Sequence, residues 1–233
     1  MKRVLILAGL LFATAAGAQQ EENWSGKATL GFLSTSGNTE NSTLNAGFEV
    51  GYKTGEWQHE LKTAAINASE DQDTTAEAYE LGWKTEYNLG PNQFVVGRLQ
   101  WRKDRFSGYD TQFSQSLGYG RRLIETETHQ WNAEIGAGAR QSDLVDGTSE
   151  EEFIFRLGTD YTWQMSENAK FEQLVSAESG PENTYIESVS SVSASLVGNL
   201  ALVFSFTVKN NSDVPVGTEK TDTFTAISLE YLF

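Results

Sequence analysis

Apolar and polar residues alternate with a period of two in twelve segments of this chain. In one of them Ile227, Leu229, Tyr231 and Phe233 alternate with more polar residues such as Glu230. This is the side-chain periodicity of a β-strand. The segments run for about ten residues or more, which exceeds the typical five or six of globular strands and suits a tilted strand that crosses a bilayer. The pattern therefore restricts the chain to β architectures and favours a membrane barrel.

The twelve segments are spread along the chain from residue 24 onward. They lie near residues 24–34, 44–53, 57–69, 79–89, 93–106, 110–124, 131–140, 153–164, 170–179, 185–196, 200–209 and 222–233. The segment 185–196 shows the weakest pattern because it is rich in serine. The short spacing between segments predicts hairpins, so neighbouring strands should be antiparallel.

The connections between the segments alternate in length. Short ones fall at 54–56, 90–92, 125–129, 166–169 and 197–199, and longer, more polar ones fall at 34–41, 70–75, 107–108, 142–150, 180–184 and 210–221. Outer-membrane barrels have short periplasmic turns and longer external loops. Both termini would then be periplasmic, which requires an even strand number, and twelve satisfies that condition.

Aromatic residues gather beside the short connections. They are Tyr52, Trp57, Tyr87, Trp131, Trp163, Phe171 and Tyr231, and they predict a girdle at the periplasmic interface. The strands of a soluble β-sandwich also alternate apolar and polar residues, but they are shorter. In such a sandwich, bulky aromatic residues rarely lie at the same end of so many strands. The prediction is an all-β, 12-stranded antiparallel up-and-down transmembrane β-barrel.

The beginning of the chain looks like a secretory signal. Lys2 and Arg3 precede an apolar run at 4–16, and the run is followed by Ala16-Gly17-Ala18, an A-x-A cleavage site. This predicts a cleaved signal peptide at 1–18 and a barrel domain at 19–233. Since no other segment approaches ~18 apolar residues, the expected location is the outer membrane of a Gram-negative bacterium.

The last strand predicts how the barrel is assembled. A strand that ends on an aromatic residue is typical of outer-membrane barrels, and Leu229, Tyr231 and Phe233 form the expected assembly signal. The expected partners are the barrel assembly machinery, outer-membrane lipid and lipopolysaccharide.

Composition argues against several classes of function. The formal net charge is −15, whereas nucleic-acid binding requires a basic surface, so no nucleic-acid partner is expected. The chain has no cysteine, which removes disulfides and thiolate metal sites. His59 and His129 are isolated and make no zinc set. No metal and no cofactor are expected.

The stretch Gly31-Phe32-Leu33-Ser34-Thr35-Ser36-Gly37-Asn38-Thr39-Glu40-Asn41-Ser42 resembles the first hairpin of the YdiY-like family of salt-induced outer-membrane proteins, domain-of-unknown-function family 481. The resemblance extends over the whole mature chain. It implies a small outer-membrane barrel and supplies no catalytic residues. Taken alone, the Ser-Gly-Asn-Thr motif is also a sensible turn, since Gly37 and Asn38 tolerate positive φ.

If the apolar faces meet lipid, a charged set of side chains points into the lumen. The candidates for lining it are Arg98, Arg102, Arg122, Arg140, Arg156, Glu80 and Glu134. The arginines come from consecutive strands and would suit anionic solutes, because a guanidinium binds carboxylate or phosphate in a bidentate way. The alternative is that they pair with Glu80, Glu86, Glu134 and Asp160 on neighbouring strands. A narrow channel and a structural barrel both remain open.

Two alternative functions are an outer-membrane enzyme and a surface-binding protein. A twelve-stranded outer-membrane phospholipase would need a Ser nucleophile and a His base on the outer face near the outer leaflet, whereas His59 and His129 both fall at the periplasmic end. No enzyme is therefore expected. A surface-binding protein acting through its loops is the second alternative.

Overall fold

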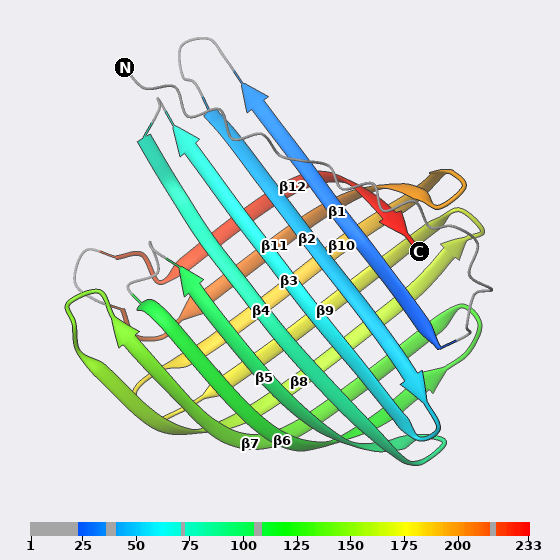
Figure 1. The fold of residues 1–233 in the computed structure, drawn as a ribbon, viewed down its shortest axis with the longest axis horizontal. Helices are drawn as coiled ribbons and strands as arrows, with labels where there is room; N and C mark the ends of the chain where they lie inside the picture. The colour runs from blue at the N-terminus through cyan, green and yellow to red at the C-terminus, as the bar shows by residue number, and fades with distance from the viewer. Residues whose placement is uncertain (1–22, 36–40, 71–72, 105–108, 215–217) are drawn as a thin grey trace.

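The computed structural model describes residues 23–35, 41–70, 73–104, 109–214 and 218–233. These residues form one closed barrel in which every neighbouring pair of strands is antiparallel (Figure 1). The strands are β1 (Trp24–Thr35), β2 (Asn41–Thr54), β3 (Trp57–Glu70), β4 (Asp73–Gly90), β5 (Gln93–Asp104), β6 (Tyr109–Glu125), β7 (His129–Leu144), β8 (Ser149–Ser166), β9 (Ala169–Ser179), β10 (Thr184–Val197), β11 (Leu200–Asn211) and β12 (Thr221–Leu232). The predicted twelve-stranded up-and-down barrel is confirmed.

Some predicted boundaries differ from the observed ones. The strand expected near 79–89 begins at Asp73, because the Thr/Ala-rich stretch before it pairs with β3. His129 opens β7 and is not part of the turn. The serine-rich segment is a complete strand, β10, because cross-strand pairing on both sides outweighs its weak pattern. The signal peptide at 1–18 and the connection at 107–108 lie outside the described residues.

The outer face of the barrel carries the apolar half of the alternation. Phe32, Leu117 and Phe155 are each about two-thirds exposed, at 66%, 66% and 64%. So large an exposed apolar surface around a closed barrel is what a lipid-facing wall requires. Within the described residues, no helix has the length and apolar character needed to cross a membrane.

Paired aromatic rings mark the short-turn end of the barrel. The ring centroids of Trp24 and Tyr52 lie 4.5 Å apart, and those of Trp57 and Tyr87 lie 4.8 Å apart. His129 stacks against Trp163 at 6.0 Å. Trp57, Tyr87 and Trp163 lie within a few positions of a short turn, and Trp24 begins β1 opposite Tyr52, so aromatic side chains gather at this end as predicted.

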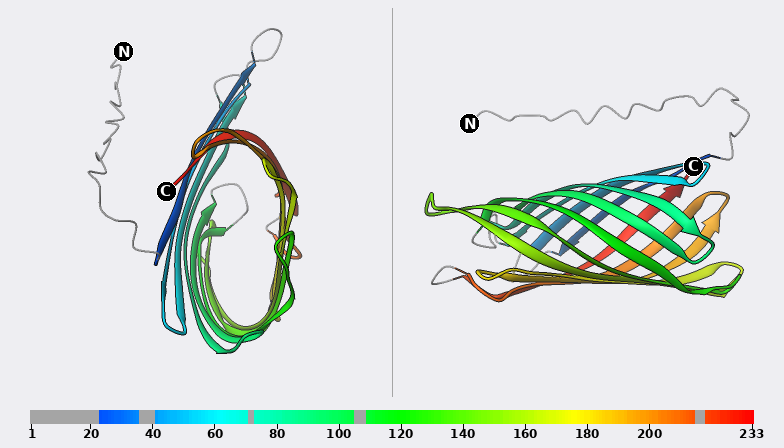
Figure 2. Two further views of the ribbon diagram at one scale, coloured as in Figure 1. Left: turned by 90° about the vertical axis from the view of Figure 1, so that its right-hand side faces the viewer. Right: turned by 90° about the horizontal axis from the view of Figure 1, so that it is seen from below.

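The barrel closes through a short ladder between β1 and β12. The pairing runs from Lys27 opposite Leu232 to Gly31 opposite Ser228. Gly26 and Phe233 extend it with two backbone hydrogen bonds of 2.8 and 3.0 Å. At the opposite end, the ends of β1 to β4 project beyond the other strands (Figures 1 and 2).

Phe233 also contributes side-chain packing to the closure. Its ring stacks on Phe48 at 5.9 Å, and it lies over Gly26, where a Cβ would come within 2.4 Å of the ring. The ring is half exposed, at 49%, on the outer face of the barrel.

Deletion of Phe233 is expected to impair membrane insertion more than folded stability. The deletion removes the two bonds to Gly26 and an interfacial aromatic, while the ladder from Lys27 to Gly31 remains. Outer-membrane abundance and the melting temperature of the purified barrel should be compared with those of Phe233→Tyr. Normal outer-membrane levels of the shortened chain would contradict the assembly role.

Cysteine labelling in intact cells should distinguish the two ends of the barrel. Val145 lies in the β7–β8 connection and Glu56 in the β2–β3 turn. They are better positions than the neighbouring Gly147 and Gly55, whose positive φ values of 87° and 56° disfavour cysteine. Val145→Cys should react with an impermeant maleimide from outside, and Glu56→Cys only after the outer membrane is opened. The reverse pattern would invert the topology.

Candidate functional site

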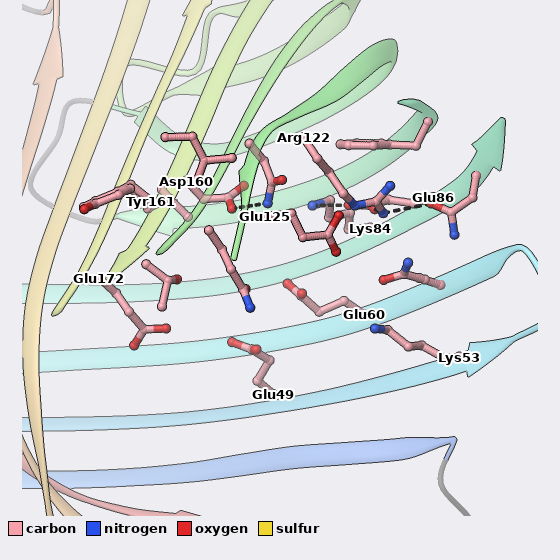
Figure 3. A pocket seen from close by; sticks show the side chains of 18 of the residues that line it. Glu49, Lys53, Glu60, Lys84, Glu86, Arg122, Glu125, Asp160, Tyr161 and Glu172 are labelled. Carbon is pink, nitrogen blue, oxygen red and sulfur yellow. Dashed lines mark hydrogen bonds and ion pairs between the residues drawn. The ribbon is translucent and has the colours of Figure 1, made fainter. Parts of the chain in front are cut away.

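The short-turn half of the lumen contains a cavity of about 910 Å³. Glu56, Pro91 and Glu125, which lie in or beside short turns, border it at one end, and Ser191 lies deeper along the barrel. Glu49, Glu60 and Glu172 point into the same space from different strands (Figure 3). The cavity therefore lies at the end of the barrel that carries the short turns.

Charges of both signs line this cavity in nearly equal number. The cations are Lys27, Lys53, Lys62, Lys84, Arg98 and Arg122, and the carboxylates are Glu49, Glu56, Glu60, Glu86, Glu125, Asp160 and Glu172. The wall as a whole is close to neutral. It therefore suits small charged or zwitterionic solutes rather than one strongly charged class.

Two carboxylates organise the cations of β4, β5 and β6. Arg98 donates hydrogen bonds of 2.8 to 3.1 Å to Glu134, which also pairs with Lys84 at 3.1 Å. Glu86 pairs with Lys84 and, at 3.6 Å, with Arg122. Because Arg98 and Glu134 lie on β5 and β7, two strands apart, the pair spans the inner surface of β6. These bonds fix the cations against the wall.

Deeper in the lumen, three arginines converge on Glu178 of β9. Arg102 and Arg156 each approach its carboxylate to 2.8 Å, and Arg140 approaches it to 3.8 Å. The strands involved are β5, β7, β8 and β9, so the side chains reach one another across up to four strands of the wall. Arg140 is 0% exposed and Glu178 is 2% exposed. We call these four residues the Glu178 layer.

The Glu178 layer is enclosed by further buried groups. Arg140 donates to Glu152 at 3.0 Å and to the backbone carbonyl of Asn183 at 2.5 Å. The Arg102 guanidinium lies 3.9 Å from the ring centre of Tyr185. Ile154, two residues before Arg156 on β8, is fully buried. Beyond Arg102 and Tyr185 there is a residual space of only about 20 Å³, lined in part by Asp222 from the long-loop end. On the side of the lumen faced by β5 to β9, this layer lies between the wide cavity and the long-loop end. On the other side of the lumen a further space of about 250 Å³ borders the wide cavity and shares Lys62 and Glu172 with it.

The predicted lumen residues divide between these two parts of the lumen. Arg98, Arg122 and Glu134 belong to the cavity wall, and Arg102, Arg140 and Arg156 belong to the Glu178 layer. The seventh, Glu80, accepts a hydrogen bond of 2.8 Å from Gln100 and pairs with no arginine within 4 Å among the described residues. Asp160 is bonded by Asn132 instead of an arginine.

The residues at the centre of the layer were not predicted from the sequence to lie in the lumen. Glu178, Glu152, Asn183 and Tyr185 are among the most buried residues of the chain, yet each lies near the end of a strand next to a predicted loop. The available signal was alternation, because Glu178 falls on the same strand face as Glu172, which lines the cavity. Contacts across the barrel between distant strands leave no such periodic signal.

Both histidines lie in the short-turn half of the barrel. His59 shares a hydrogen bond of 2.9 Å with Thr85 and stacks on Trp57, and His129 shares one of 2.8 Å with Tyr161. Neither has a serine partner among the bonds of the described residues. Among all the residues that the structure describes, no three His, Asp or Glu side chains are grouped so that they could hold a metal ion.

Comparison with known proteins supports the fold and the family. Residues 28–233 match the family described as "Protein of unknown function, DUF481". The "Uncharacterized protein YdiY" of Escherichia coli (strain K12) is 29% identical over 242 residues, covering 98% of this chain and 96% of that protein. The resemblance read from the first hairpin is thereby confirmed.

Solved structures of porins resemble the barrel in fold. The NanC porin has a TM-score of 0.51 at 9% identity and covers 88% of this chain and 97% of its own. The KdgM porin has a TM-score of 0.48 at 9% identity, with 90% and 99% covered. Such a barrel implies the outer membrane of a diderm bacterium.

Proposed function

Since this chain belongs to the DUF481 family, we propose a role that its own lumen supports: a narrow outer-membrane channel for small charged solutes, closed at rest by the Glu178 layer. The observation that carries the proposal is the contrast between a cavity of about 910 Å³ and the thin charged layer beyond it. A barrel built only for stability could fill its whole length with side chains.

The chemistry of the layer suits a gate. Its members are ionic and can be hydrated one by one, whereas an apolar plug would have to be unpacked as a unit. Three guanidinium nitrogens, Arg102 Nε, Arg140 Nη1 and Arg156 Nε, have no hydrogen-bond partner among the described residues. Donors left free in the layer favour small anions as the solutes that cross it.

The cavity wall gives no such preference, because its charges nearly balance. Selectivity should therefore arise at the Glu178 layer, and the preference for anions should be weak. Buried pairs are screened by salt much less than exposed ones, so moderate changes in ionic strength should leave the resting state closed.

Cysteine accessibility tests the closed state directly, because the chain has no native cysteine. Thr162 lines the cavity, and Ser114 contacts the Glu178 layer by donating a hydrogen bond to Glu178 at 3.2 Å. Thr162→Cys should react with a charged thiosulfonate added on the short-turn side only, and Ser114→Cys should resist the reagent from both sides. Reaction of Thr162→Cys from both sides would refute a closed layer.

Planar-bilayer recording is the complementary test. Purified wild-type protein should show a low baseline with brief small openings, and a salt gradient should give a reversal potential slightly on the anion side. A large, steady conductance would contradict the gate, and complete silence under every voltage would favour a purely structural barrel.

The remaining expectations from the sequence stand as parts of this proposal. The placement of both histidines near the periplasmic end supports a role other than that of a lipid hydrolase. The family resemblance suggests that expression in a Gram-negative host rises with salt. Binding to a surface partner is the competing function, and it predicts that removal of the external loops abolishes the role while the lumen remains dispensable.

A further inference from the structure

An open groove of about 680 Å³ crosses the outer wall of the barrel from β4 to β8. These five strands are consecutive in the barrel (Figure 1). Bulky exposed side chains stand around the groove and small ones lie between them. The bulky residues are Trp83, Leu99, Leu117 and Phe153, and the small ones are Gly97, Ala137 and Ala139. The volume falls within the roughly 300–1,000 Å³ of small-molecule sites, so the groove has room for a ligand of that size.

The groove is on the lipid-facing side of the wall, because the side chains that form it alternate with those of the lumen. Ser114 donates to Glu178 inside the barrel, and the next residue of β6, Gln115, is therefore outward and is exposed. Inward residues such as Arg98 also border the groove. Since the Arg98 guanidinium bonds Glu134 in the lumen, such residues contribute through their backbone.

Gln115 is a polar side chain in an apolar part of this wall. Along β6 it lies between the outward residues Phe113 and Leu117, and across the strands it lies opposite Leu99 and Ala139. Within the part of the chain that the structure describes, its amide forms no hydrogen bond. An unbonded amide is unfavourable in hydrocarbon. A partner from outside the chain is therefore expected.

Two other polar side chains of the outer wall are bonded within the chain. Gln173 exchanges hydrogen bonds of 2.5 and 3.0 Å with two serines of β10. Thr85, which also borders the groove, shares a hydrogen bond of 2.9 Å with His59. Gln115 differs from both, because neither its donors nor its acceptor is satisfied by the described residues.

Gln115 lies at the depth of the outer leaflet. Its cross-strand partner Ala139 is eight positions from Trp131 along β7, and Trp131 belongs to the aromatic set beside the short turns. At roughly 2.5 Å of height per residue for a strand tilted by about 40°, Gln115 lies about 20 Å from that aromatic set, near the far edge of an apolar band about 25 Å tall. With the long loops outside, this is the region where acyl chains of the outer leaflet join their headgroups.

The chemistry of the acyl linkage distinguishes the lipids that could occupy the groove. A glutamine amide needs an acceptor for its N–H groups and a donor for its oxygen. The acyl chains of lipopolysaccharide are attached through amides as well as esters and carry hydroxyl groups near these linkages, so they supply both. The linkages of a phosphatidylcholine are esters and supply acceptors alone.

A second copy of the barrel fits the groove less well. In a two-fold contact each residue lies near its own copy, and the outward carboxylates of Asp143 and Glu151, toward the long loops, would face their counterparts. A lipid headgroup can move away from these carboxylates into water, whereas a rigid barrel cannot. Lys103 is exposed at the same end but pairs with Asp110 at 3.5 Å. Phosphate thus meets mixed charge, and recognition rests on the hydrocarbon and the linkage groups.

We propose that this groove binds the acyl region of lipopolysaccharide in the outer leaflet. The chains lie against Leu99, Leu117 and Phe153. The amide of Gln115 exchanges hydrogen bonds with the amide or hydroxyl groups next to the chain linkages. The site is on the outer wall, so this binding is independent of conduction past the Glu178 layer.

Native mass spectrometry of the purified barrel in detergent tests the binding, with lipid A and dipalmitoyl phosphatidylcholine as the added probes. The wild type should bind lipid A at least tenfold more tightly than phosphatidylcholine. Gln115→Leu should lose about tenfold in affinity for lipid A, as expected for one or two hydrogen bonds, and keep its affinity for phosphatidylcholine. Gln173→Leu makes the same change outside the groove and should behave as the wild type. Equal affinities of the wild type for the two lipids would overturn the proposal.

A pair of variants on β7 tests the location of the site. Ala139→Phe places a ring in the groove, and Ala133→Phe places one on the same strand face outside it. Both should first show the heat-modifiable migration of a folded barrel. The first should reduce lipid A affinity by more than tenfold, because an overfilled site binds poorly, and the second should leave it unchanged. Equal affinities in the two folded variants would overturn the proposal. Dimers that form without added lipid and are lost in Ala139→Phe would assign the groove to a second copy instead.

Discussion

Replacement of Glu178 with alanine is expected to destabilise the barrel by about 3–5 kcal/mol, the usual effect of removing one partner from a buried ion pair. Arg102 and Arg156 would each lose an ion pair of 2.8 Å, and Arg140 would lose one of 3.8 Å. The site is almost dry, with Glu178 2% exposed, so water cannot readily replace the carboxylate. The measurement is denaturant unfolding in detergent, followed by tryptophan fluorescence.

Glu178→Ala protein that still folds should also conduct ions differently from the wild type. Arg102 and Arg156 would be left without their carboxylate and Arg140 would keep only Glu152, so these guanidinium groups would repel one another and hydrate, which should raise the open probability. Their positive charge should move the reversal potential strongly toward anions in a salt gradient. The physical cause is the same as that of the lost stability, so the two effects should appear together.

Glu172→Ala is the matched control for this prediction. Glu172 lies on the same strand and the same face as Glu178, but it borders the wide cavity and pairs with Lys170 at 3.1 Å, with side-chain exposures of 35% and 29%. An ion pair this exposed contributes little to stability. If Glu172→Ala and Glu178→Ala melt alike, the layer is not the electrostatic centre of the lumen.

The fold could be predicted from the sequence because a barrel repeats a local rule. Alternation, strand length and turn length each depend on residues close together in the chain, so twelve strands and the direction of Arg102 or Arg140 follow without knowledge of the partners. Only the ends of some strands were not predicted. At Asp73, for example, pairing with β3 extends a strand whose apolar alternation is weak.

The centre of the lumen could not be predicted in the same way. Arg102 and Glu178 are 76 residues apart in sequence, and their contact depends on barrel closure and on side-chain length across the lumen. Glu86 and Glu134 could be expected from the sequence as arginine partners, and they pair with Arg122 and Arg98 on nearby strands. The short length of the β1–β12 ladder could not be predicted, because the period-two pattern of β1 and β12 is the same whether or not their edges are paired.

The double variant Arg102→Ala/Arg140→Ala is expected to shift the reversal potential in the direction opposite to that of Glu178→Ala. It leaves Glu178 with Arg156 alone, and it leaves Glu152 without the guanidinium that donates to it at 3.0 Å. Two long side chains also leave the layer, so the passage should widen. The expected result is a larger conductance that favours cations.

The same variant should lose stability, again on the order of several kcal/mol, because in a dry site Glu152 loses its arginine and Glu178 keeps only one of three. The control is Lys103→Ala/Arg121→Ala, which removes the same charge from neighbouring strands. Lys103 forms only an exposed pair with Asp110 at 3.5 Å, and Arg121 is exposed. That control should match the wild type in melting temperature and in reversal potential.

The two charge changes together separate a gate from a mere filling of the barrel. If the Glu178 layer lies on the path of ions, removing its carboxylate and removing its cations must shift the reversal potential in opposite directions. If it only stabilises the wall, both variants will melt earlier, but neither will change selectivity relative to its control. A wild-type melting temperature and wild-type conductance in the Arg102→Ala/Arg140→Ala protein would mean that these arginines do not face the lumen as described, and the channel proposal would be wrong with them.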